Sequence, residues 1–133
     1  MRVVVDTNLF VSRLLFAQSV PARAVDRAMT EATLLASDAT LAELADVLNR
    51  PKFDRWVGAE VRREFLDRVA SVVVKIRISE RITACRDPRD NAMLELAVNG
   101  RAQRILSGDD DLLAMSPFRG IGIVRPAEYL ASG

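Results

Sequence analysis

The amino-acid sequence predicts a three-layer α/β/α fold over a single domain, residues 1–133, with a central, mostly parallel sheet of about five strands. Short apolar runs alternate with helical segments, and the first run, Val3-Val4-Val5, is apolar at consecutive positions. Such a run is typical of a strand buried on both faces of a parallel sheet. Alternating strands and helices favour right-handed crossovers and helices on both faces.

The length and composition agree with one folded domain. The chain has 133 residues, of which 50% are hydrophobic and 28% are charged. A chain of this length buries roughly two-thirds of its unfolded surface around one core. The formal net charge of +1 does not by itself indicate a nucleic-acid partner.

After the first strand, the pattern predicts a helix, a short strand and a second helix. The helix over 21–31 begins at Pro21, a residue favoured in the first turn, and repeats apolar residues at helical spacing. The apolar run 33–37 is a predicted strand. The next helix has capping residues at 38–40, a stripe of leucines for the core, and Pro51 at its end.

The second half of the chain continues the alternation. A helix is predicted over about 59–70, and the β-branched segment 72–78 predicts a strand at the sheet edge. Asp87 and Pro88 begin a helix that runs to Asn99, and Gly100 is predicted to close it in the left-handed conformation. Two further strands are predicted, over 104–107 and 121–124.

This order of elements brings four acidic residues to one edge of the sheet. In a doubly wound sheet the carboxyl ends of the strands and the amino ends of the following helices meet at the same edge. Asp6 and Asp109 follow the first and fourth strands, and Glu43 and Asp90 lie near the starts of two helices. We expect these four side chains to converge, with Asp111 as a candidate fifth member.

A cluster of carboxylates indicates a divalent metal ion. Crowded carboxylates repel one another unless a cation neutralises them, and oxygen ligands suit Mg²⁺ or Mn²⁺. The chain contains no histidine, which excludes a Ser/His/Asp triad and histidine-bound zinc. A hard cation held by carboxylates can activate a bound water and neutralise the charge that develops on a phosphodiester, so the cluster indicates phosphodiester hydrolysis.

Each acidic residue also has a structural explanation. Asp6 suits a turn or the start of a helix, and Glu43 suits a capping box with Thr40. Asp87 suits an N-cap. Asp90 shares the apolar face of its helix, and a carboxylate that points inward needs a partner, for which a metal ion is well suited.

The neighbouring polar residues have two readings as well. Asn8 and Ser107 are either supporting hydrogen-bonding groups or ordinary turn residues. Arg86 and Arg89 are candidate contacts to substrate phosphates, although surface solvation explains either one alone. Cys85 has the features of an inert, small hydrophobic residue.

The sequence predicts a cytoplasmic protein without a membrane segment. No early apolar stretch is long enough to cross a bilayer, and the first residues do not form a signal peptide. The single cysteine cannot form an internal disulfide, which agrees with a reducing compartment.

Taken together, four segments of the chain resemble the PIN domain. They are Val3-Val4-Val5-Asp6-Thr7-Asn8, the internal Glu43, Asp87-Pro88-Arg89-Asp90-Asn91, and Ser107-Gly108-Asp109-Asp110-Asp111-Leu112-Leu113. Their order and spacing are similar to those of short bacterial and archaeal PIN proteins related to the VapC toxins of toxin–antitoxin systems. The family frequently has Thr where this chain has Ser107, a change that keeps the hydroxyl.

The resemblance implies a Mg²⁺- or Mn²⁺-dependent ribonuclease. It implies that the catalytic and metal-binding residues are Asp6, Glu43, Asp90 and Asp109, that Asp111 is a further ligand, and that Asn8 and Ser107 support them. It further implies a homodimer that is inhibited by a small antitoxin protein encoded next to it.

Two other classes of protein share parts of this pattern. Receiver-type phosphoacceptor domains and aspartate-type phosphatases also carry Asp at strand ends, but they need a lysine near the phosphoryl group. The only lysines are Lys52 and Lys75, and neither is predicted to follow a strand end. A phosphatase would also need Asp at the position of Asn8. The second alternative is a non-catalytic PIN-like module that binds RNA or a protein partner.

Overall fold

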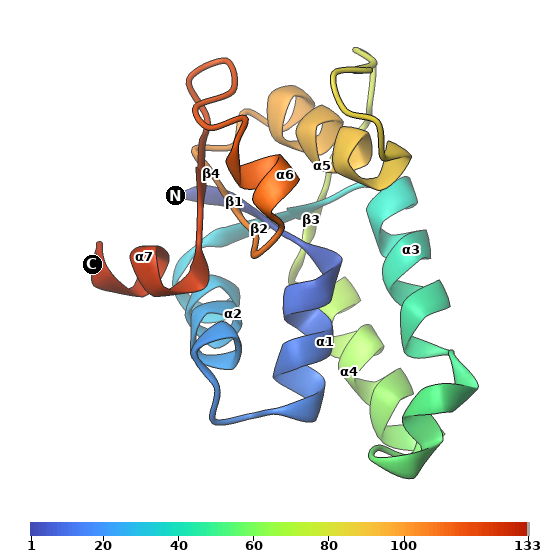
Figure 1. Cartoon of the computed structure of the whole chain (residues 1–133). Helices are drawn as coiled ribbons and strands as arrows, with labels where there is room; N and C mark the ends of the chain where they lie inside the picture. Colours follow the sequence, from blue (N-terminus) through green and yellow to red (C-terminus); the bar gives the residue numbers. More distant parts are fainter. Residues whose placement is uncertain (133) are drawn as a thin grey trace.

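The computed structural model describes residues 1–132 and contains a five-stranded sheet between two layers of helices (Figure 1). Its elements, in chain order, are β1 (Arg2–Val5), α1 (Thr7–Leu15), α2 (Val20–Glu31), β2 (Thr33–Ala36), α3 (Asp38–Leu48), the 3₁₀ helix η1 (Pro51–Arg55), α4 (Ala59–Val72), β3 (Val74–Lys75), α5 (Pro88–Asn99), β4 (Arg104–Leu106), α6 (Asp110–Leu113), β5 (Gly122–Val124) and α7 (Pro126–Ala131).

All strand pairs of the sheet are parallel, and the order is β3-β2-β1-β4-β5. The chain builds outward from β1 through β2 to β3, and then returns to the other side of β1 to add β4 and β5. The reversal lies between β1 and β4. In sheets of this kind ligands bind outside the carboxyl ends of the strands at such a reversal. The predicted three-layer fold is confirmed.

The two layers of helices bury opposite sides of the same strands. Val3 and Val5 belong to one hydrophobic core with side chains of α1, α2, α3, α4 and α7, whereas Val4 belongs to a second core with side chains of α5 and α6. All three valines are at most 5% exposed. The run is apolar at consecutive positions because both faces of β1 are covered, as the sequence predicted.

The connection between β3 and α5, residues 76–87, lies along α5 in the opposite direction. The backbone N–H of Ser79 donates to the Asn99 side chain at the end of α5 (3.0 Å), and that of Ile82 donates to Glu95 one turn earlier (2.8 Å). The N–H of Cys85 donates to Asn91 near the start of α5 (2.8 Å). These bonds return the chain to the carboxyl edge of the sheet, where α5 begins.

Several elements differ from the sequence prediction. Helix α1 was not predicted, and neither were η1, α6 and α7. The predicted strand 72–78 is reduced to Val74–Lys75, because α4 continues to Val72 and only these two residues pair with β2. One further bond follows the strand, from the backbone N–H of Ile76 to the carbonyl oxygen of Ala36 (2.7 Å).

The predicted role of Gly100 was wrong. Its φ is −87°, and the left-handed conformation falls instead on Arg101, whose φ is 55°. A Cβ at Gly100 would lie 2.7 Å from Cδ1 of Leu35 and 2.9 Å from the carbonyl oxygen of Leu96. Gly100 is therefore required by the close approach of the end of α5 to the sheet, and not by a turn conformation.

A buried arginine joins α3, η1 and α4. Arg62 of α4 is 4% exposed, and its Nη1 donates to the carbonyl oxygens of Leu48 (3.1 Å) and Arg50 (3.0 Å). Its Nη2 forms an ion pair with Asp54 of η1. The guanidinium thus satisfies carbonyl groups at and beyond the carboxyl end of α3, where a positive charge is also favourable for the helix dipole.

No helix within residues 1–132 combines the length and the apolar character needed to cross a bilayer.

Candidate active site

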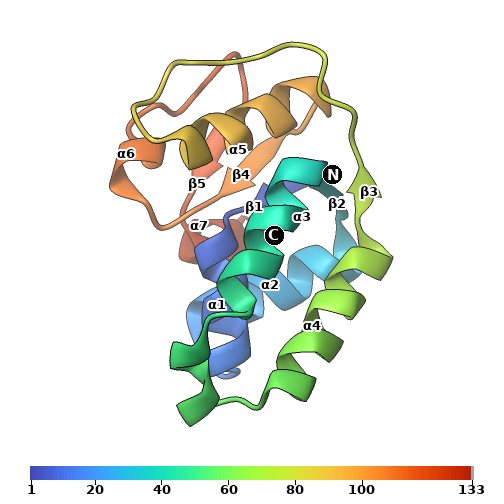
Figure 2. The ribbon, with the colours of Figure 1, turned by 90° about the vertical axis from the view of Figure 1, so that its right-hand side faces the viewer.

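A small polar cavity lies at the reversal point of the sheet, beside the carboxyl ends of β1 and β4. It has a volume of about 90 Å³ and is lined by residues from β1–α1, α3, α5 and β4–α6: Asp6, Asn8, Glu43, Val47, Arg50, Asp87, Arg89, Asp90, Met93 and Asp109. The four acidic residues that the order of elements predicted to meet are all among them. Figure 2 shows α3 and α5 facing each other on this side of the molecule.

Asp6 is held by hydrogen bonds to both of its carboxylate oxygens. One oxygen accepts the backbone N–H of Asn8 (3.2 Å) and so caps α1, and the other accepts the hydroxyl of Ser107 (2.7 Å). Ser107 is fully buried, and its oxygen also accepts the backbone N–H of Asp109 (3.0 Å). One hydroxyl group therefore links the ends of β1 and β4 and orients two of the acidic residues.

Asp90 is the most perturbed carboxyl group of the cavity. It is 8% exposed, and its pKa is raised from 3.8 to about 6, first by burial and then by the charges of Asp109 and Asp87. Contact with the Asp109 side chain and the charge of Asp6 act in the same direction. Burial and crowding by neighbouring carboxylates therefore disfavour the charged form of Asp90.

Glu43 occupies the wall of the cavity on α3. Its carboxylate accepts the hydroxyl of Thr7 (3.3 Å) and lies 3.9 Å from Nε of Arg89. Burial raises its pKa, while the Thr7 hydrogen bond and the Arg89 charge act in the opposite direction. Its position is therefore determined by contacts between separate segments of the chain.

The alternative reading of Glu43 as a capping residue was wrong. The capping box of α3 is made by Ser37 and Thr40, with the backbone N–H of Ser37 donating to the Thr40 hydroxyl (2.9 Å) and that of Thr40 donating to the Ser37 hydroxyl (3.2 Å). Glu43 lies almost a turn further along and is free to face the cavity.

Asp87 combines a structural position with a place in the cavity wall. Its side chain caps α5 by accepting the backbone N–H of Arg89 (2.9 Å), as the sequence predicted, and it also pairs with the Arg89 guanidinium (3.2 Å). These bonds, the backbone one first, lower its pKa. The sequence did not identify its place in the wall, although its spacing of three residues from Asp90 was a usable signal.

The remaining candidate residues divide between the cavity and its surroundings. Asn8 and Arg89 line the cavity, but Asp111 and Arg86 are exposed and do not. Asp111 contributes its backbone N–H to the Asp109 carboxylate (2.9 Å). Arg50, which the sequence did not single out, lines the cavity from the end of α3.

One of the two lysines lies at the end of a strand, contrary to the prediction. Lys75 does end β3, but its ammonium group pairs with Asp38 (2.7 Å) and does not line the acidic cavity. Lys52 lies in η1, and it too is absent from the cavity wall. The acidic cavity therefore has arginines but no lysine for a phosphoryl group.

The donor set of the cavity fits a hard divalent cation. It offers carboxylate oxygens and no thiolate or imidazole, which is the preference of Mg²⁺ and Mn²⁺. The buried Asp90, whose pKa is raised by burial and by the charge of Asp109, is a place where a cation would relieve repulsion. As the side chains stand, no three acidic or thiol groups among residues 1–132 are grouped closely enough to hold a metal ion. Metal binding therefore requires some of these side chains to turn.

The chain is similar to known proteins in both sequence and structure. A family model described as PIN domain matches residues 2–111. An uncharacterized protein of Methanocaldococcus jannaschii is 31% identical over 116 residues, which cover 86% of this chain and 74% of that protein.

Three solved structures share the fold at low sequence identity. The crystal structure of VapBC2 from Rickettsia felis, bound to a DNA fragment from its promoter, matches with a TM-score of 0.64 and 13% identity, covering 94% of this chain and 98% of that one. The VapC20 toxin of Mycobacterium tuberculosis, which cleaves the sarcin-ricin loop, gives 0.58 and 13%, covering 86% and 95%. A domain of a functionally unknown M. jannaschii protein gives 0.55 and 18%, covering 93% and 89%.

Proposed function

The chain belongs to the PIN-domain family, and from this we propose that it is a divalent-metal-dependent endoribonuclease whose acidic cavity hydrolyses phosphodiester bonds of RNA. One observation carries the proposal: carboxylates from four separate segments line a single cavity at the reversal point of the sheet. Like charges collected in a small cavity lower the stability of a fold unless a cation neutralises them, and such clusters are typical of functional sites. Cation-assisted hydrolysis is the use that these groups support best.

The metal ligands in this proposal are Asp6, Glu43, Asp90 and Asp109, with Asp111 at the periphery. Their oxygens suit Mg²⁺ or Mn²⁺. When bound, a divalent cation supplies Lewis-acid stabilisation of the charge that develops on the phosphodiester.

The surrounding residues have separate tasks. The Ser107 hydroxyl orients the Asp6 carboxylate through its 2.7 Å hydrogen bond. Asn8 offers its amide at the rim of the cavity, where it is exposed to substrate. Arg89, together with Arg50, is suited to contact the non-bridging oxygens of the phosphate, with Arg86 as a more distant candidate.

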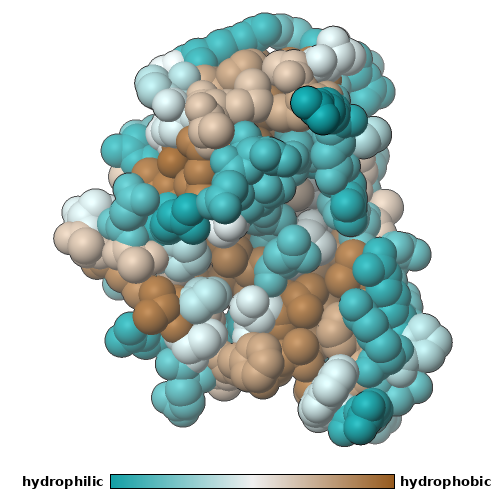
Figure 3. All heavy atoms as spheres, in the orientation of Figure 1, coloured by the Kyte–Doolittle hydropathy of each residue, from teal (hydrophilic) through white to brown (hydrophobic). Residues whose placement is uncertain are grey.

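We further propose that the chain is the toxin of a toxin–antitoxin pair, acting in the cytoplasm as a homodimer that a small, adjacently encoded antitoxin inhibits. The VapC likeness supports this idea at the level of the fold. An apolar surface supports a protein partner: Phe16 and Trp56 are 64% and 65% exposed and line a pocket of about 200 Å³ with Leu15. Figure 3 shows apolar surface over the helices below the sheet in this view.

Replacing Asp6 with Asn is expected to abolish Mn²⁺-dependent cleavage of single-stranded RNA and to leave the fold intact. The amide keeps the size of the side chain and an acceptor for the Asn8 N–H, but it removes the charge that attracts the metal. Cleavage of a fluorescent RNA is measured with Mn²⁺ and with chelator, and circular dichroism checks the fold. Asp67→Asn, an exposed change on α4, is the matched control. Equal activity in Asp6→Asn and the wild-type protein would contradict the proposed site.

Expression of the wild-type chain in a bacterial host is expected to arrest growth, and co-expression of the adjacent open reading frame is expected to restore it. Asp6→Asn is expected to be harmless, because the arrest depends on RNA cleavage. Colony counts after induction measure the effect. Unimpaired growth with wild-type protein present at normal levels would remove the toxin assignment while leaving the ribonuclease assignment to the cleavage assay.

A further inference from the structure

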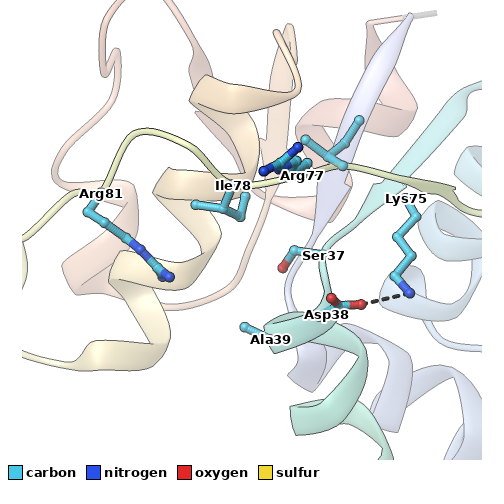
Figure 4. Close-up of a pocket in the computed structure, with 8 residues that line it drawn as sticks. Ser37, Asp38, Ala39, Lys75, Arg77, Ile78 and Arg81 are labelled. Carbon is cyan, nitrogen blue, oxygen red and sulfur yellow. Dashed lines mark ion pairs between the residues drawn. The ribbon is translucent and has the colours of Figure 1, made fainter.

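A second cavity, larger than the acidic one, lies where the chain leaves β3 and passes over the start of α3. It has a volume of about 500 Å³ and is lined by Ser37, Asp38, Ala39, Lys75, Ile76, Arg77, Ile78 and Arg81. Figure 4 shows that these side chains come from two segments only, the first turn of α3 and residues 75–81. We call this cavity the basic cleft.

Positive charge dominates the basic cleft. Lys75, Arg77 and Arg81 line it, against a single carboxylate, that of Asp38. The ion pairs of these cations lie at the surface. Lys75 pairs with Asp38, and the two side chains are 62% and 87% exposed. Arg81 lies 3.6 Å from Glu95, and its side chain is 76% exposed. Exposed ion pairs contribute little and are readily exchanged for a new anion.

Arg77 has the most available guanidinium group of the cleft. It is exposed, and among residues 1–132 it has no ion-pair partner and no side-chain hydrogen bond. The structure therefore contains an open cleft in which, within residues 1–132, the Arg77 guanidinium is unpaired and the ion pairs of Lys75 and Arg81 leave both cations exposed.

The basic cleft and the acidic cavity lie side by side along α3. Ala39 lines the basic cleft, and Glu43 and Val47, each four residues further on, line the acidic cavity from the same face of the helix. One such step advances about 6 Å along the helix axis. Helix α5 borders the same region: Arg81 lies 3.6 Å from Glu95 in its second half, and Asp90 near its start lines the acidic cavity.

We propose that the basic cleft binds the sugar–phosphate backbone of single-stranded RNA next to the bond that the acidic cavity cleaves, a role that rests on the ribonuclease function proposed above. The cavity with five carboxylates and two arginines repels a polyanion. An RNA substrate therefore needs cations near the cavity. Contacts of lysine and arginine side chains with the RNA phosphates supply affinity and fix the position of the strand. The volume and the short step along α3 suit neighbouring nucleotides of one strand.

The double substitution Arg77→Gln with Arg81→Gln tests this role. Binding of a fluorescent single-stranded RNA to the 133-residue chain is measured by anisotropy in EDTA, so that no cleavage occurs, over a series of salt concentrations. We expect affinity to fall about tenfold or more and the slope of log K against log salt to become shallower by about 1.4, since each lost phosphate contact on a single strand accounts for about 0.7.

The matched control is Arg23→Gln with Arg63→Gln, which removes the same charge from exposed positions on α2 and α4. It is expected to bind RNA like the wild-type protein apart from a small general charge effect. If the cleft variant and this control have the same affinity and the same salt slope, the proposal is overturned. Wild-type protein that binds no RNA at low salt would overturn it as well.

The RNA-binding test of the basic cleft and the ribonuclease test of the proposed function can fail independently of each other. Binding in EDTA does not require metal or cleavage, whereas the ribonuclease assay requires both. If RNA affinity depends on Arg77 and Arg81 but no metal-dependent cleavage occurs, the basic cleft is supported as an RNA site and the nuclease function is rejected. If cleavage occurs with equal efficiency in both double variants, the cleft has no part in holding the substrate.

Discussion

Replacing Asp90 with Asn is expected to stabilise the metal-free protein at neutral pH and, at the same time, to remove its metal-dependent activity. Asp90 is 8% exposed and faces Asp109, and its pKa is raised to about 6, mainly by burial. At pH 7 the wild-type protein therefore holds an unfavourable buried charge, which the amide does not have. The gain is expected to be about 1–3 kcal/mol, since one pKa unit corresponds to about 1.4 kcal/mol.

The stability difference between Asp90→Asn and the wild-type protein is expected to depend on pH in a definite direction. The pKa of Asp90 is higher in the folded protein, about 6, than its ordinary value of 3.8, so the folded state binds the proton more tightly. The contribution of Asp90 to wild-type stability is therefore most favourable below about pH 4 and is lost as the pH rises through about 6. The advantage of Asp90→Asn is expected to appear over the same range and to be negligible near pH 4.

Thermal unfolding of both proteins in EDTA, from pH 4 to pH 8, measures this effect. Added Mn²⁺ is expected to raise the melting temperature of the wild-type protein and to leave Asp90→Asn nearly unchanged, because the variant has lost a ligand. RNA cleavage is expected to fall by about a thousandfold or more, in line with the loss of a group that stabilises transition-state charge. A variant that is less stable than wild type at pH 7, or that retains activity, would contradict the assigned role of Asp90.

Replacing Arg62 with Ala is expected to destabilise the fold by about 2–4 kcal/mol. The buried guanidinium donates to the carbonyl oxygens of Leu48 and Arg50 and pairs with Asp54. The substitution leaves those carbonyl groups without their donors and opens a cavity, and hydrogen bonds to charged groups contribute about 1.5–3 kcal/mol each. Because Asp54 is 65% exposed, water compensates its charge, which keeps the loss below that of a fully buried pair.

The neighbouring Arg63→Ala is the matched control for Arg62→Ala. Arg63 follows Arg62 on α4 but is exposed, and its loss is expected to change stability by at most about 0.5 kcal/mol. Urea denaturation of both variants gives the free energies of unfolding. If the two substitutions have similar effects, the guanidinium of Arg62 does not hold α3, η1 and α4 together in the way described above.

The sequence by itself determined the layers of the fold and the neighbourhood of the site. The uninterrupted run Val3–Val5 required cover on both faces of its strand, and the alternation of strands and helices dictated a parallel sheet. Once the strands are parallel, residues that follow a strand or begin the next helix must meet at one edge. The convergence of Asp6, Glu43, Asp90 and Asp109 could be predicted for this reason, because local pattern and chain order are properties of the sequence.

Only the tertiary structure decided the contacts of individual side chains. Glu43 accepts the hydroxyl of Thr7 and not the backbone of Thr40, and Arg62 is buried among the carbonyl groups at the end of α3. Gly100 is required by the side chain of Leu35, and the basic cleft exists because residues 75–81 pass over α3. Each of these facts depends on the distance between segments far apart in the chain, and neither helical periodicity nor capping preference carries that information.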